Sequence, residues 1–429
     1  MNFSDSEIVA SILSKEGFAT TTDISEADLI FINTCSIRDN AEQRVLRRLK
    51  MLQSLKKKNP GLIIGLLGCM AERLKEELLE KEQVLDLVAG PDVYRDLPKL
   101  IRQVGSGQKA INILLSQEET YADIAPVRYD SNGISAFISI MRGCENYCAY
   151  CVVPYVRGLE RSRAAASIIR EATFLFQHGY REITLLGQNV NSYCWVNPDK
   201  TITGFADLLN QVAQINPLLR IRFSTSHPKD LSNELLHTIA LYKNICRSIH
   251  LPVQSGSSRI LDKMNRGYSR DQYMDRINAI HKILPDCAIS TDVIVGFCSE
   301  TENDHNETLS LMKEIGFDSA FMFRYSERPD TLAANNYKDD VPFEDKERRL
   351  KEIIDLQQSL SYKSNEKDKG KKFEVLIEGY SKRSKEHFSG RNSQNKVVVF
   401  PKTNDKPGDY VSAVIQGFTS ATLLGKAVS

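Results

Sequence analysis

The sequence predicts an α/β protein with three parts: a small parallel α/β domain, a partial (β/α) barrel and a small C-terminal β-barrel. Two alternations predict the first two parts. Strand-like apolar runs alternate with helical stripes over residues 1–105, and again in larger units over 130–368. In residues 369–429 the helices give way to short alternating runs separated by Gly and Asn. A chain of 429 residues is long enough for these three domains.

Composition narrows the class of protein. Hydrophobic residues make up 41% and charged residues 26%, which is ordinary for a globular protein and excludes collagen-like or wholly disordered chains. No apolar run approaches the roughly 18 residues of a membrane helix, and the first 30 residues lack a signal-peptide core. We therefore expect a cytoplasmic protein without a membrane partner. Nine cysteines in such a chain favour metal or redox chemistry over a disulfide framework.

The first domain is expected to open on a helix. Ser4 to Glu7 form a capping-box pattern, followed by an apolar stripe. After this helix, three strands alternate with three helices. The strands are expected at 29–33, 62–67 and 84–88, and the helices at 39–58, 71–81 and 93–104. Because a βα series starts with a strand, we expect the natural polypeptide to begin upstream. Residues 106–132 are polar without periodicity and predict a linker.

Six strand candidates follow in the second part. They are expected at 135–141, 182–186, 220–224, 247–251, 288–295 and 318–325, with a long charged helix over 343–368. Six βα units at this spacing fit a complete or partial barrel, in which ligands bind where strands end. The tail has strand candidates at 373–379, 396–400, 410–415 and 421–426, which is the pattern of an OB-like barrel.

Charge is unevenly distributed along the chain. Residues 363–429 carry 13 Lys and Arg against 7 Asp and Glu, a net charge of +6, whereas the other 362 residues carry −5. A basic module favours an anionic partner, first of all nucleic acid. Basic residues gather on the second helix and in the tail: Arg44, Arg47, Arg48, Lys50, Lys56, Lys57, Lys58, Lys371, Lys372, Lys382, Arg383, Lys385, Arg391 and Lys396. Both groups can meet RNA phosphates, although a solvated face is the alternative for the helix. Arg383 and Phe388 are candidates to stack on or flank bases.

Three cysteines carry the strongest chemical signal. Cys144, Cys148 and Cys151 have the spacing C-x3-C-x2-C directly after a predicted strand. Three thiolates on one loop can hold three irons of a [4Fe–4S] cluster and leave the fourth iron open to a small molecule. Zinc is the alternative, but it prefers four ligands, and no fourth Cys or His lies near in the sequence.

This loop after the first barrel strand resembles the radical S-adenosylmethionine (SAM) superfamily. Further stretches resemble its methylthiotransferase branch: residues 140–144, 152–163, 186–193, 224–228, 250–257 and 290–297. Two motifs, Asn33-Thr-Cys35-Ser-Ile-Arg38-Asp-Asn-Ala-Glu42 and Gly68-Cys69-Met-Ala-Glu-Arg73, most resemble the MiaB-type tRNA methylthiotransferases. Residues 371–429 are similar to the TRAM domain, an RNA-binding β-barrel. The resemblance covers nearly the whole chain.

The resemblance implies that Cys144, Cys148 and Cys151 hold a catalytic [4Fe–4S] cluster that cleaves SAM to a 5′-deoxyadenosyl radical. The cofactor-binding candidates stand at the ends of barrel strands: Gly187, Gln188, Asn189, Ser226, Gln254 and Gly296, with Ser255 beside them. Glycines let the backbone approach a ligand, and amides can bind an amino group or a ribose. We expect the exposed backbone of Gly296 to face an adenine. For these glycines a plain turn is the alternative. His227 is a candidate base, with a structural role as its alternative.

Cys35 and Cys69 each follow a predicted strand, so a parallel sheet would bring both to its carboxyl edge. The resemblance implies an auxiliary [4Fe–4S] cluster there, which carries the sulfur to be transferred. In relatives its third cysteine ends the first strand, and this sequence lacks that residue. The upstream start expected above explains the gap. The alternative is a two-cysteine variant in which another cysteine stands in: Cys194, Cys246, Cys287 or Cys298. Cys298 and Ser299 also replace a Pro and a Gly common in relatives, with no expected loss of chemistry.

The implied activity is the addition of a methylthio group to carbon 2 of N(6)-dimethylallyladenosine at position 37 of tRNA. One SAM would methylate the sulfur and another would supply the radical. The implied partners are tRNA, an electron donor such as flavodoxin or ferredoxin, and a sulfur or Fe–S donor, with the protein as a monomer. One alternative is the same chemistry on threonylcarbamoyladenosine in tRNA or on an aspartate of a ribosomal protein. Another is an RNA-binding Fe–S protein without turnover.

Overall fold

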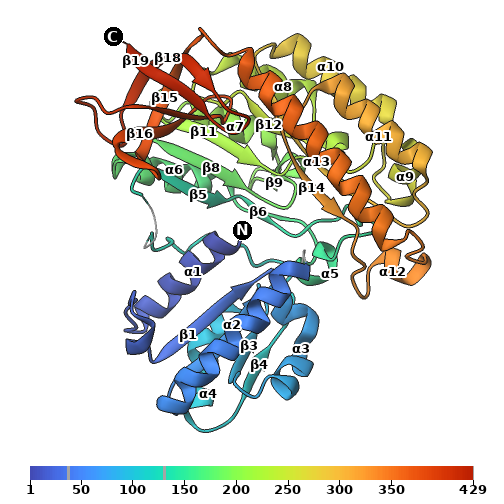
Figure 1. Cartoon of the computed structure of the whole chain (residues 1–429). Helices are drawn as coiled ribbons and strands as arrows, with labels where there is room; N and C mark the ends of the chain where they lie inside the picture. Colours follow the sequence, from blue (N-terminus) through green and yellow to red (C-terminus); the bar gives the residue numbers. More distant parts are fainter. Residues whose placement is uncertain (36–38, 129–131, 429) are drawn as a thin grey trace. The chain divides into compact units, whose positions relative to one another are not determined.

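The computed structural model describes residues 1–35, 39–128 and 132–428 (Figure 1). The chain divides into two compact units. The first comprises Met1–Tyr129 and Met141–Arg163, and the second comprises Asp130–Ile140 and Ala164–Ser429. No helix in the described residues is both long and apolar enough to cross a membrane. The domain boundaries expected from the sequence stay predictions.

The first unit contains a parallel sheet of four strands in sequence order. Its strands are β1 (Leu29–Thr34), β2 (Ile63–Gly68), β3 (Leu87–Ala89) and β4 (Ala110–Asn112). Its helices are α1 (Asn2–Lys15), α2 (Asp39–Lys58), α3 (Cys69–Lys81) and α4 (Leu97–Gly105), with short 3-10 turns η1 (Ile24–Glu26) and η2 (Tyr94–Asp96). The alternation of strands and helices is confirmed. The linker prediction is wrong at β4, where three residues are too few to show periodicity.

Two apolar layers cover this sheet. One contains residues of α1 and α4 packed on Leu67 and Leu87, and the other contains residues of α2 and α3 packed on Leu66 and Val88. Successive residues of one strand point to opposite faces, so helices are held on both sides. The capping box predicted at Ser4 to Glu7 is wrong. The helix begins at Asn2 without a side-chain cap, and the acidic side chain of Asp5 is buried.

Residues 141–163 of the first unit form a short antiparallel pair with a helix between its strands. The elements are β6 (Met141–Arg142), α5 (Val153–Arg157) and β7 (Arg161–Ser162). The three-cysteine segment lies between β6 and α5.

The second unit contains six parallel strands in two sheets of three, with orders β11-β8-β5 and β12-β13-β14. The strands are β5 (Ser135–Ser139), β8 (Glu182–Leu186), β11 (Arg220–Ser224), β12 (Ser248–His250), β13 (Ala288–Val295) and β14 (Ser319–Arg324). A parallel bridge between Ile221 and Ile245 links the two sheets. The six strands and the partial (β/α) barrel are thus confirmed. Buried apolar runs made these strands visible in the sequence.

Helices alternate with the barrel strands along the chain. They are α6 (Ala165–Gln177), α7 (Phe205–Ala213), α8 (Asn233–Leu241), α9 (Ser258–Lys263), α10 (Arg270–Ile283), α11 (Glu302–Ile315), α12 (Leu332–Asn336) and α13 (Phe343–Glu366). A small hairpin of β9 (Cys194–Val196) and β10 (Ile202–Gly204) and the turns η3 (Val190–Ser192) and η4 (Pro228–Asp230) complete this part. Figure 1 shows the helices on the outer side of the strands.

The tail forms a closed barrel in the order β15-β16-β17-β19-β18. The strands are β15 (Lys372–Ser381), β16 (Ser384–Asn392), β17 (Val397–Pro401), β18 (Tyr410–Phe418) and β19 (Leu423–Val428). The predicted barrel is confirmed, but β16 was missed. Its inward positions are Phe388, Gly390 and Asn392, so only one of them is apolar.

A buried ionic cluster fastens this small barrel to the amino ends of β8 and β11. Glu182 Oε2 accepts from Arg220 Nε at 2.6 Å and from Arg222 Nε at 2.8 Å. The same guanidiniums donate to the backbone carbonyls of Arg391 and Asn392 at 2.6 and 2.8 Å. Burial raises the pKa of Glu182, but the two guanidiniums outweigh it and hold that pKa below its usual value. The small barrel is therefore attached at the amino ends of the strands, whereas ligands of such barrels bind at the carboxyl ends.

Candidate functional site

The three-cysteine loop begins with a glycine that its backbone requires. Gly143 has φ +81°, and a Cβ there would lie 2.6 Å from Gly158 O and closer still to Leu159 O. That Gly158 carbonyl accepts from Cys144 N at 3.2 Å, and Cys151 N donates to Cys148 O at 2.9 Å. These two backbone hydrogen bonds hold the segment between β6 and α5 in a compact loop that contains all three cysteines.

Two donors are directed at the cysteine sulfurs of this loop. Asn146 Nδ2 donates to Cys144 Sγ and Val153 N donates to Cys151 Sγ, both at 3.4 Å. Burial raises the pKa of Cys144. Three thiols on one loop, two of them with an N–H donor at the sulfur, fit a [4Fe–4S] cluster, whose properties depend on such bonds. Among the described residues, no three His, Cys, Asp or Glu side chains are already gathered around one point.

Cys35 and Cys69 leave neighbouring strands at the same edge, as expected. In the register of β1 and β2, Thr34 is paired with Gly68, and each cysteine is the next residue. Thr34 Oγ1 donates to Leu67 O at 2.7 Å and accepts from Met70 N at 3.2 Å, which holds the two strand ends together. Residues 36–38 of the Cys35 motif, including Arg38, lie outside the described residues.

Sequence analysis missed Arg157, a buried arginine of α5 that contacts Cys69. Its Nε donates to Cys69 Sγ at 3.1 Å and its Nη2 lies 2.8 Å from Asp5 Oδ2. The Cys69 side chain also packs against Val152 and Val156 of the same segment. Within the first unit, Cys69 is therefore in contact with the helix that follows the three-cysteine loop. The match of residues 152–163 to the family motif was the available signal, although it gave Arg157 no role.

The predicted cofactor residues of the second unit carry polar atoms that lack partners. Among the described residues, the buried side-chain oxygens of Gln188, Asn189, Ser226 and Gln254 have no hydrogen-bond partner. Val190 N donates to Thr225 O at 2.9 Å, which joins the loops after β8 and β11. A buried polar atom left unpaired costs about 1–3 kcal/mol, so several at the ligand end of one barrel indicate a polar ligand. The amino and hydroxyl groups of SAM, which donate hydrogen bonds, fit such a set of oxygens.

Gly187 lies at the end of β8, as expected, and is buried. Asn191, in the same loop, also has a side chain with unpaired polar atoms, because neither polar atom of its amide has a partner in the described part of the chain. Asn189 Nδ2 donates to Asp230 Oδ2 at 2.6 Å, which fixes the amide with its oxygen unpaired. Thr225 and Gln254 have φ of 75° and 72°, a strained conformation that non-glycine residues retain mostly at functional sites. Asn191 is thus a further candidate contact.

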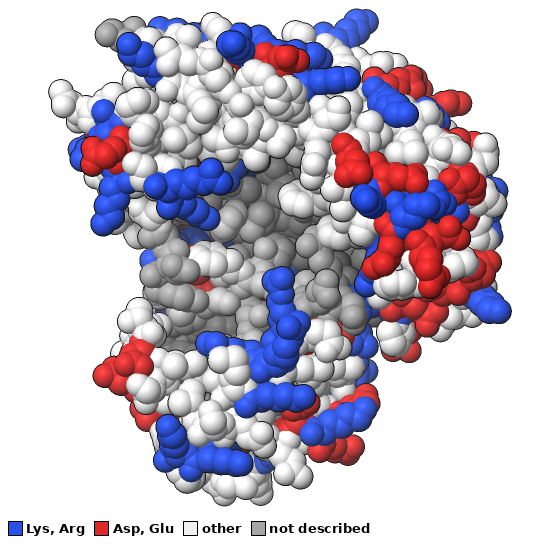
Figure 2. Space-filling view, in the orientation of Figure 1, with Lys and Arg blue, Asp and Glu red and all other residues white. Residues whose placement is uncertain are grey.

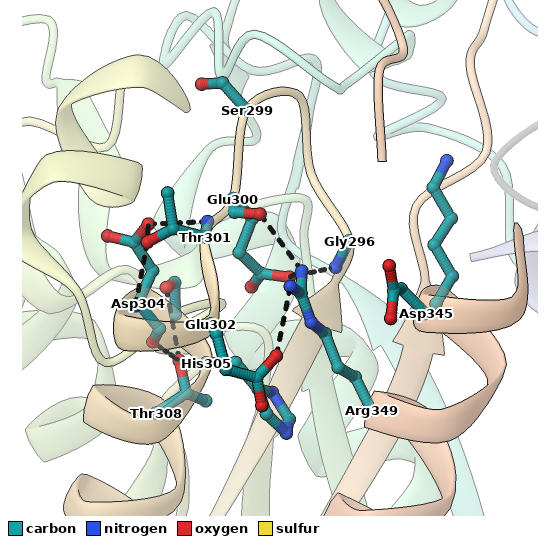
Figure 3. A network of polar contacts seen from close by, with 12 residues as sticks. Gly296, Ser299, Glu300, Thr301, Glu302, Asp304, His305, Thr308, Asp345 and Arg349 are labelled. Carbon is teal, nitrogen blue, oxygen red and sulfur yellow. Dashed lines mark hydrogen bonds and ion pairs between the residues drawn. The ribbon is translucent and has the colours of Figure 1, made fainter. Parts of the chain in front are cut away.

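The expectation of an open backbone at Gly296 is wrong. Its N–H donates to Glu300 Oε2, on which Arg349 Nη1 of α13 also converges at 3.0 Å (Figure 3). The side chain of Lys346 packs so closely on Gly296, where φ is +69°, that a Cβ there would overlap it. Burial raises the pKa of Glu300 to about 7. Gly296 is therefore a turn glycine whose amide is already used within the chain.

His227 does not have the properties of a general base. Burial, with Arg266 and Lys229 nearby, lowers its pKa to about 2. Its ring lies 5.6 Å from that of Tyr268 at an angle of 72°, and its Nδ1 accepts from Lys229 N at 3.4 Å. The structural role, which was the alternative, fits this environment. Its Nε2 is buried without a partner in the described residues and can still donate to a ligand.

The basic side chains divide into exposed and paired ones. On α2, Arg44, Arg47 and Arg48 are exposed, whereas Lys56 forms an ion pair with Asp86, and its place in the basic group stays a prediction. In the tail, the side chains of Lys372, Lys382, Arg383 and Lys385 are exposed, and so is that of Lys371. The cations of Lys371, Arg391 and Lys396 lie within 3.3 Å of carboxylates. Figure 2 shows Lys and Arg side chains over the small barrel and over the first unit.

The expected base-stacking role of Phe388 is also wrong. Phe388 is 1% exposed in the core of the small barrel. Tyr380 lies against it with ring centroids 5.4 Å apart and is 51% exposed. Lys402 Nζ lies 5.4 Å from the centre of the Tyr380 ring. The aromatic surface available for a base is therefore that of Tyr380, beside a cation.

Comparison with known proteins identifies the family of this chain. Residues 1–90 match the uncharacterized protein family UPF0004, residues 138–312 the radical SAM superfamily and residues 366–428 the TRAM domain. A protein of Amoebophilus asiaticus is 58% identical over 99% of this chain and 90% of its own length. A protein of Parabacteroides distasonis is 57% identical over 100% of this chain and 93% of its own length. Both are named tRNA-2-methylthio-N(6)-dimethylallyladenosine synthase. This chain belongs to their family.

Solved structures agree on the fold of this family member. The radical SAM methyltransferase TsrM of Kitasatospora setae, with tryptophan and a SAM analogue bound, superposes with a TM-score of 0.56 at 13% identity. The match covers 74% of this chain and 69% of TsrM. The cobalamin-dependent radical SAM enzyme OxsB gives 0.51 at 14% identity, over 83% of this chain and 54% of OxsB. Membership of the radical SAM superfamily implies a [4Fe–4S] cluster and SAM as cofactors.

Proposed function

We propose that the protein adds a methylthio group to carbon 2 of N(6)-dimethylallyladenosine at position 37 of tRNA. The observation that carries this function is identity of 54–58% over essentially the whole chain to synthases named for this product. The three-cysteine loop and the TRAM domain, which such an enzyme needs, are both present in this chain. A base inside an RNA helix must leave the stack to reach a buried site, so we expect A37 to flip out.

Both proposed cluster sites lie within the first unit. Cys144, Cys148 and Cys151 hold one [4Fe–4S] cluster, and Cys35 and Cys69 contribute two ligands to a second. When bound, the first cluster supplies the electron that cleaves SAM to a 5′-deoxyadenosyl radical. Neighbouring groups orient the cysteine sulfurs. Asn146 donates to Cys144 Sγ and the Val153 amide donates to Cys151 Sγ, and both bonds favour the thiolate form.

The strand ends of the second unit provide the proposed SAM contacts. The unpaired oxygens of Gln188, Asn189, Ser226 and Gln254 accept from the amino and hydroxyl groups of SAM. Gly187 lets the backbone approach, and Gly296 shapes its loop through Glu300. Burial of these groups away from water protects a reactive species from side reactions.

The proposed tRNA contacts are electrostatic and aromatic. Exposed Arg44 and Arg47 of α2, with Lys372, Arg383 and Lys385 of the tail, neutralise phosphates. Lys371 and Arg391 can also contribute if RNA competes with their carboxylate partners. Tyr380 offers a face for stacking. We further propose a monomer that works in the cytoplasm, where tRNA is modified, with flavodoxin or ferredoxin as electron donor and a separate sulfur or Fe–S donor.

The radical step can be tested separately from the substrate. The purified chain, reconstituted with iron and sulfide and then reduced, should convert SAM to 5′-deoxyadenosine. Cys148→Ala should abolish this product, whereas Cys194→Ala, which changes an exposed cysteine outside the loop, should not. Retained product in Cys148→Ala would contradict the assignment of the loop. Cleavage lost in both variants would point to a general defect of the protein instead of the loop.

A further inference from the structure

We propose that Phe321, on the inner face of the barrel strand β14, contacts the dimethylallyl group of the substrate adenosine and sets the preference for that group. This inference rests on the proposed function, which supplies a tRNA adenosine whose N6 carries the group. Phe321 is 56% exposed, although it lies within a strand of the parallel sheet. A large apolar side chain left uncovered at such a place offers a surface against which an apolar ligand can bind.

Phe321 points away from the helices that cover the sheet. Arg324 of the same strand pairs with Glu347 of α13 at 2.9 Å, and successive residues of a strand point to opposite faces. Phe321 therefore lies on the face opposite to α13, which packs on β13 and β14. Figure 1 shows the helices on the outer side of the strands. In a closed eight-stranded barrel, side chains fill the interior, whereas this partial barrel leaves Phe321 uncovered.

Polar side chains accompany Phe321 on this inner face. In the register of β13 and β14, Asp292 is paired with Phe321, so both point to the same side. The ring of His250, at the end of β12, meets that of Phe321 edge to face, with centroids 5.8 Å apart at 78°. His250 Nδ1 lies 3.0 Å from Ser290 Oγ, and its Nε2 lies 3.5 Å from Asp292 Oδ1. These contacts fix the His250 ring, which in turn supports the Phe321 ring.

An acceptor beside an aromatic ring matches the substituted N6 of the proposed substrate. That nitrogen carries a hydrogen and the dimethylallyl group. Neighbouring strands lie about 4.8 Å apart, so the Asp292 carboxylate can accept from N6–H while the alkyl group reaches Phe321. Phenylalanine offers no hydrogen bond to a threonylcarbamoyl group, whose carboxylate and carbonyls would lose water on burial against it. The arrangement thus favours the dimethylallyl substrate.

The same face adjoins the proposed SAM contacts. Gln254 N donates to Asp292 O at 2.9 Å, and Ile294 N donates to Gln254 O at 2.9 Å. Gln254, whose side-chain oxygen lacks a partner among the described residues, is therefore held beside the strand that carries Asp292. An adenosine at Phe321 and Asp292 would lie next to the ligand from which the radical is formed. Hydrogen abstraction requires such proximity.

The test measures the contribution of the dimethylallyl group alone. Two RNA hairpins with the anticodon-arm sequence of a tRNA carry either N(6)-dimethylallyladenosine or plain adenosine at position 37. Their dissociation constants are measured by fluorescence anisotropy with the full chain, reconstituted with iron and sulfide and supplied with SAM but no reductant. The unsubstituted protein should bind the modified hairpin roughly 10- to 100-fold more tightly, as expected for an apolar group that leaves water on binding.

Phe321→Ala should lose most of this ratio and keep its affinity for the plain hairpin. Phe321→Leu, which retains an apolar side chain, should restore part of the ratio. Phe174→Ala is the matched control, because Phe174 is 54% exposed but lies on α6, where its ring stacks on that of His178. This control should keep the full ratio. A merely structural role of Phe321 would weaken the binding of both hairpins equally and leave the ratio unchanged, which would overturn the proposal.

The remaining outcomes separate this proposal from the proposed function. A ratio that falls equally in Phe174→Ala, or an unsubstituted protein without preference, would overturn the contact with Phe321. The function is tested apart from it, by the nucleoside product of the reduced enzyme. A ratio that depends on Phe321, with no methylthiolated product from the unsubstituted enzyme, would uphold the contact and overturn the function. Product formation with a ratio that survives in Phe321→Ala would overturn the contact alone.

Discussion

Replacement of Gly143 by alanine should disrupt the three-cysteine loop at a cost that the structure allows to be worked out. The φ of +81° costs an L-residue about 1–2 kcal/mol. A Cβ would also lie 2.6 Å from Gly158 O, where real contacts stay beyond 3.0 Å, and nearer still to Leu159 O. Both are backbone atoms of the segment between α5 and β7, so the clash can be relieved only by a shift of the backbone. Overpacking of this kind adds about 1–3 kcal/mol, giving a total of about 2–5 kcal/mol.

Gly179→Ala is the matched control. Gly179 has a similar φ of +93°, but nothing lies within 4 Å of a Cβ built there. It should cost only the strain of about 1–2 kcal/mol, and the entropy that alanine removes from the unfolded chain cancels between the two variants. The assays are urea unfolding and iron content per chain after reconstitution. Gly143→Ala should lose more stability and bind less iron than Gly179→Ala. Equal stability and equal iron in the two variants would refute the reasoning.

Three further outcomes are expected. Glu182→Gln leaves two buried guanidiniums uncompensated and should lower the free energy of unfolding by about 3–5 kcal/mol; an unchanged urea midpoint would contradict the cluster's role in holding the small barrel. The pKa of His227 is about 2 in the folded protein and 6.5 when unfolded. The neutral buried imidazole therefore contributes fully to the free energy of unfolding above pH 6.5, and this contribution is lost as the pH falls. Between pH 8 and pH 5 this loss is about 2 kcal/mol, and His227→Asn should unfold without that component. Arg44→Gln with Arg47→Gln should reduce the slope of log affinity for tRNA against log salt by about 1.5, and an unchanged slope would exclude α2 from the interface.

Local patterns made most of the fold predictable. The strands of the barrel, such as β8 and β13, are buried apolar runs, and their bounds could be given nearly to the residue. β4 was not predicted because three residues are too few to show a period. β16 was not predicted because two of its three inward positions, Gly390 and Asn392, are not apolar. Missing β16 also led to the wrong role for Phe388. Which face of a strand a side chain takes cannot be known until the strand itself is recognised.

The candidate site was predictable only where its residues are close in sequence. The cysteines of the loop lie within eight residues, and Cys35 and Cys69 each follow a recognisable strand. The bond from Arg157 to Cys69 joins residues 88 apart and depends on how α5 packs against α3. Likewise, the amide of Gly296 donates to the carboxylate of Glu300, four residues later in the chain. The turn between them shows no periodic pattern in the sequence that would predict this bond. Contacts of this kind follow from tertiary packing, which pattern analysis does not describe.

The central claim, methylthiolation of a dimethylallyladenosine in tRNA, is tested most directly by its product. tRNA from a bacterial strain that lacks the activity, supplied with this chain, is digested to nucleosides and analysed by mass spectrometry. The account predicts that 2-methylthio-N(6)-dimethylallyladenosine appears as the unthiolated precursor falls, and that Cys148→Ala reverses both changes. Persistence of the precursor, with the expressed protein carrying its clusters and cleaving SAM, would contradict the claim. A methylthio group on threonylcarbamoyladenosine or on a ribosomal protein instead would assign the same chemistry to a different acceptor.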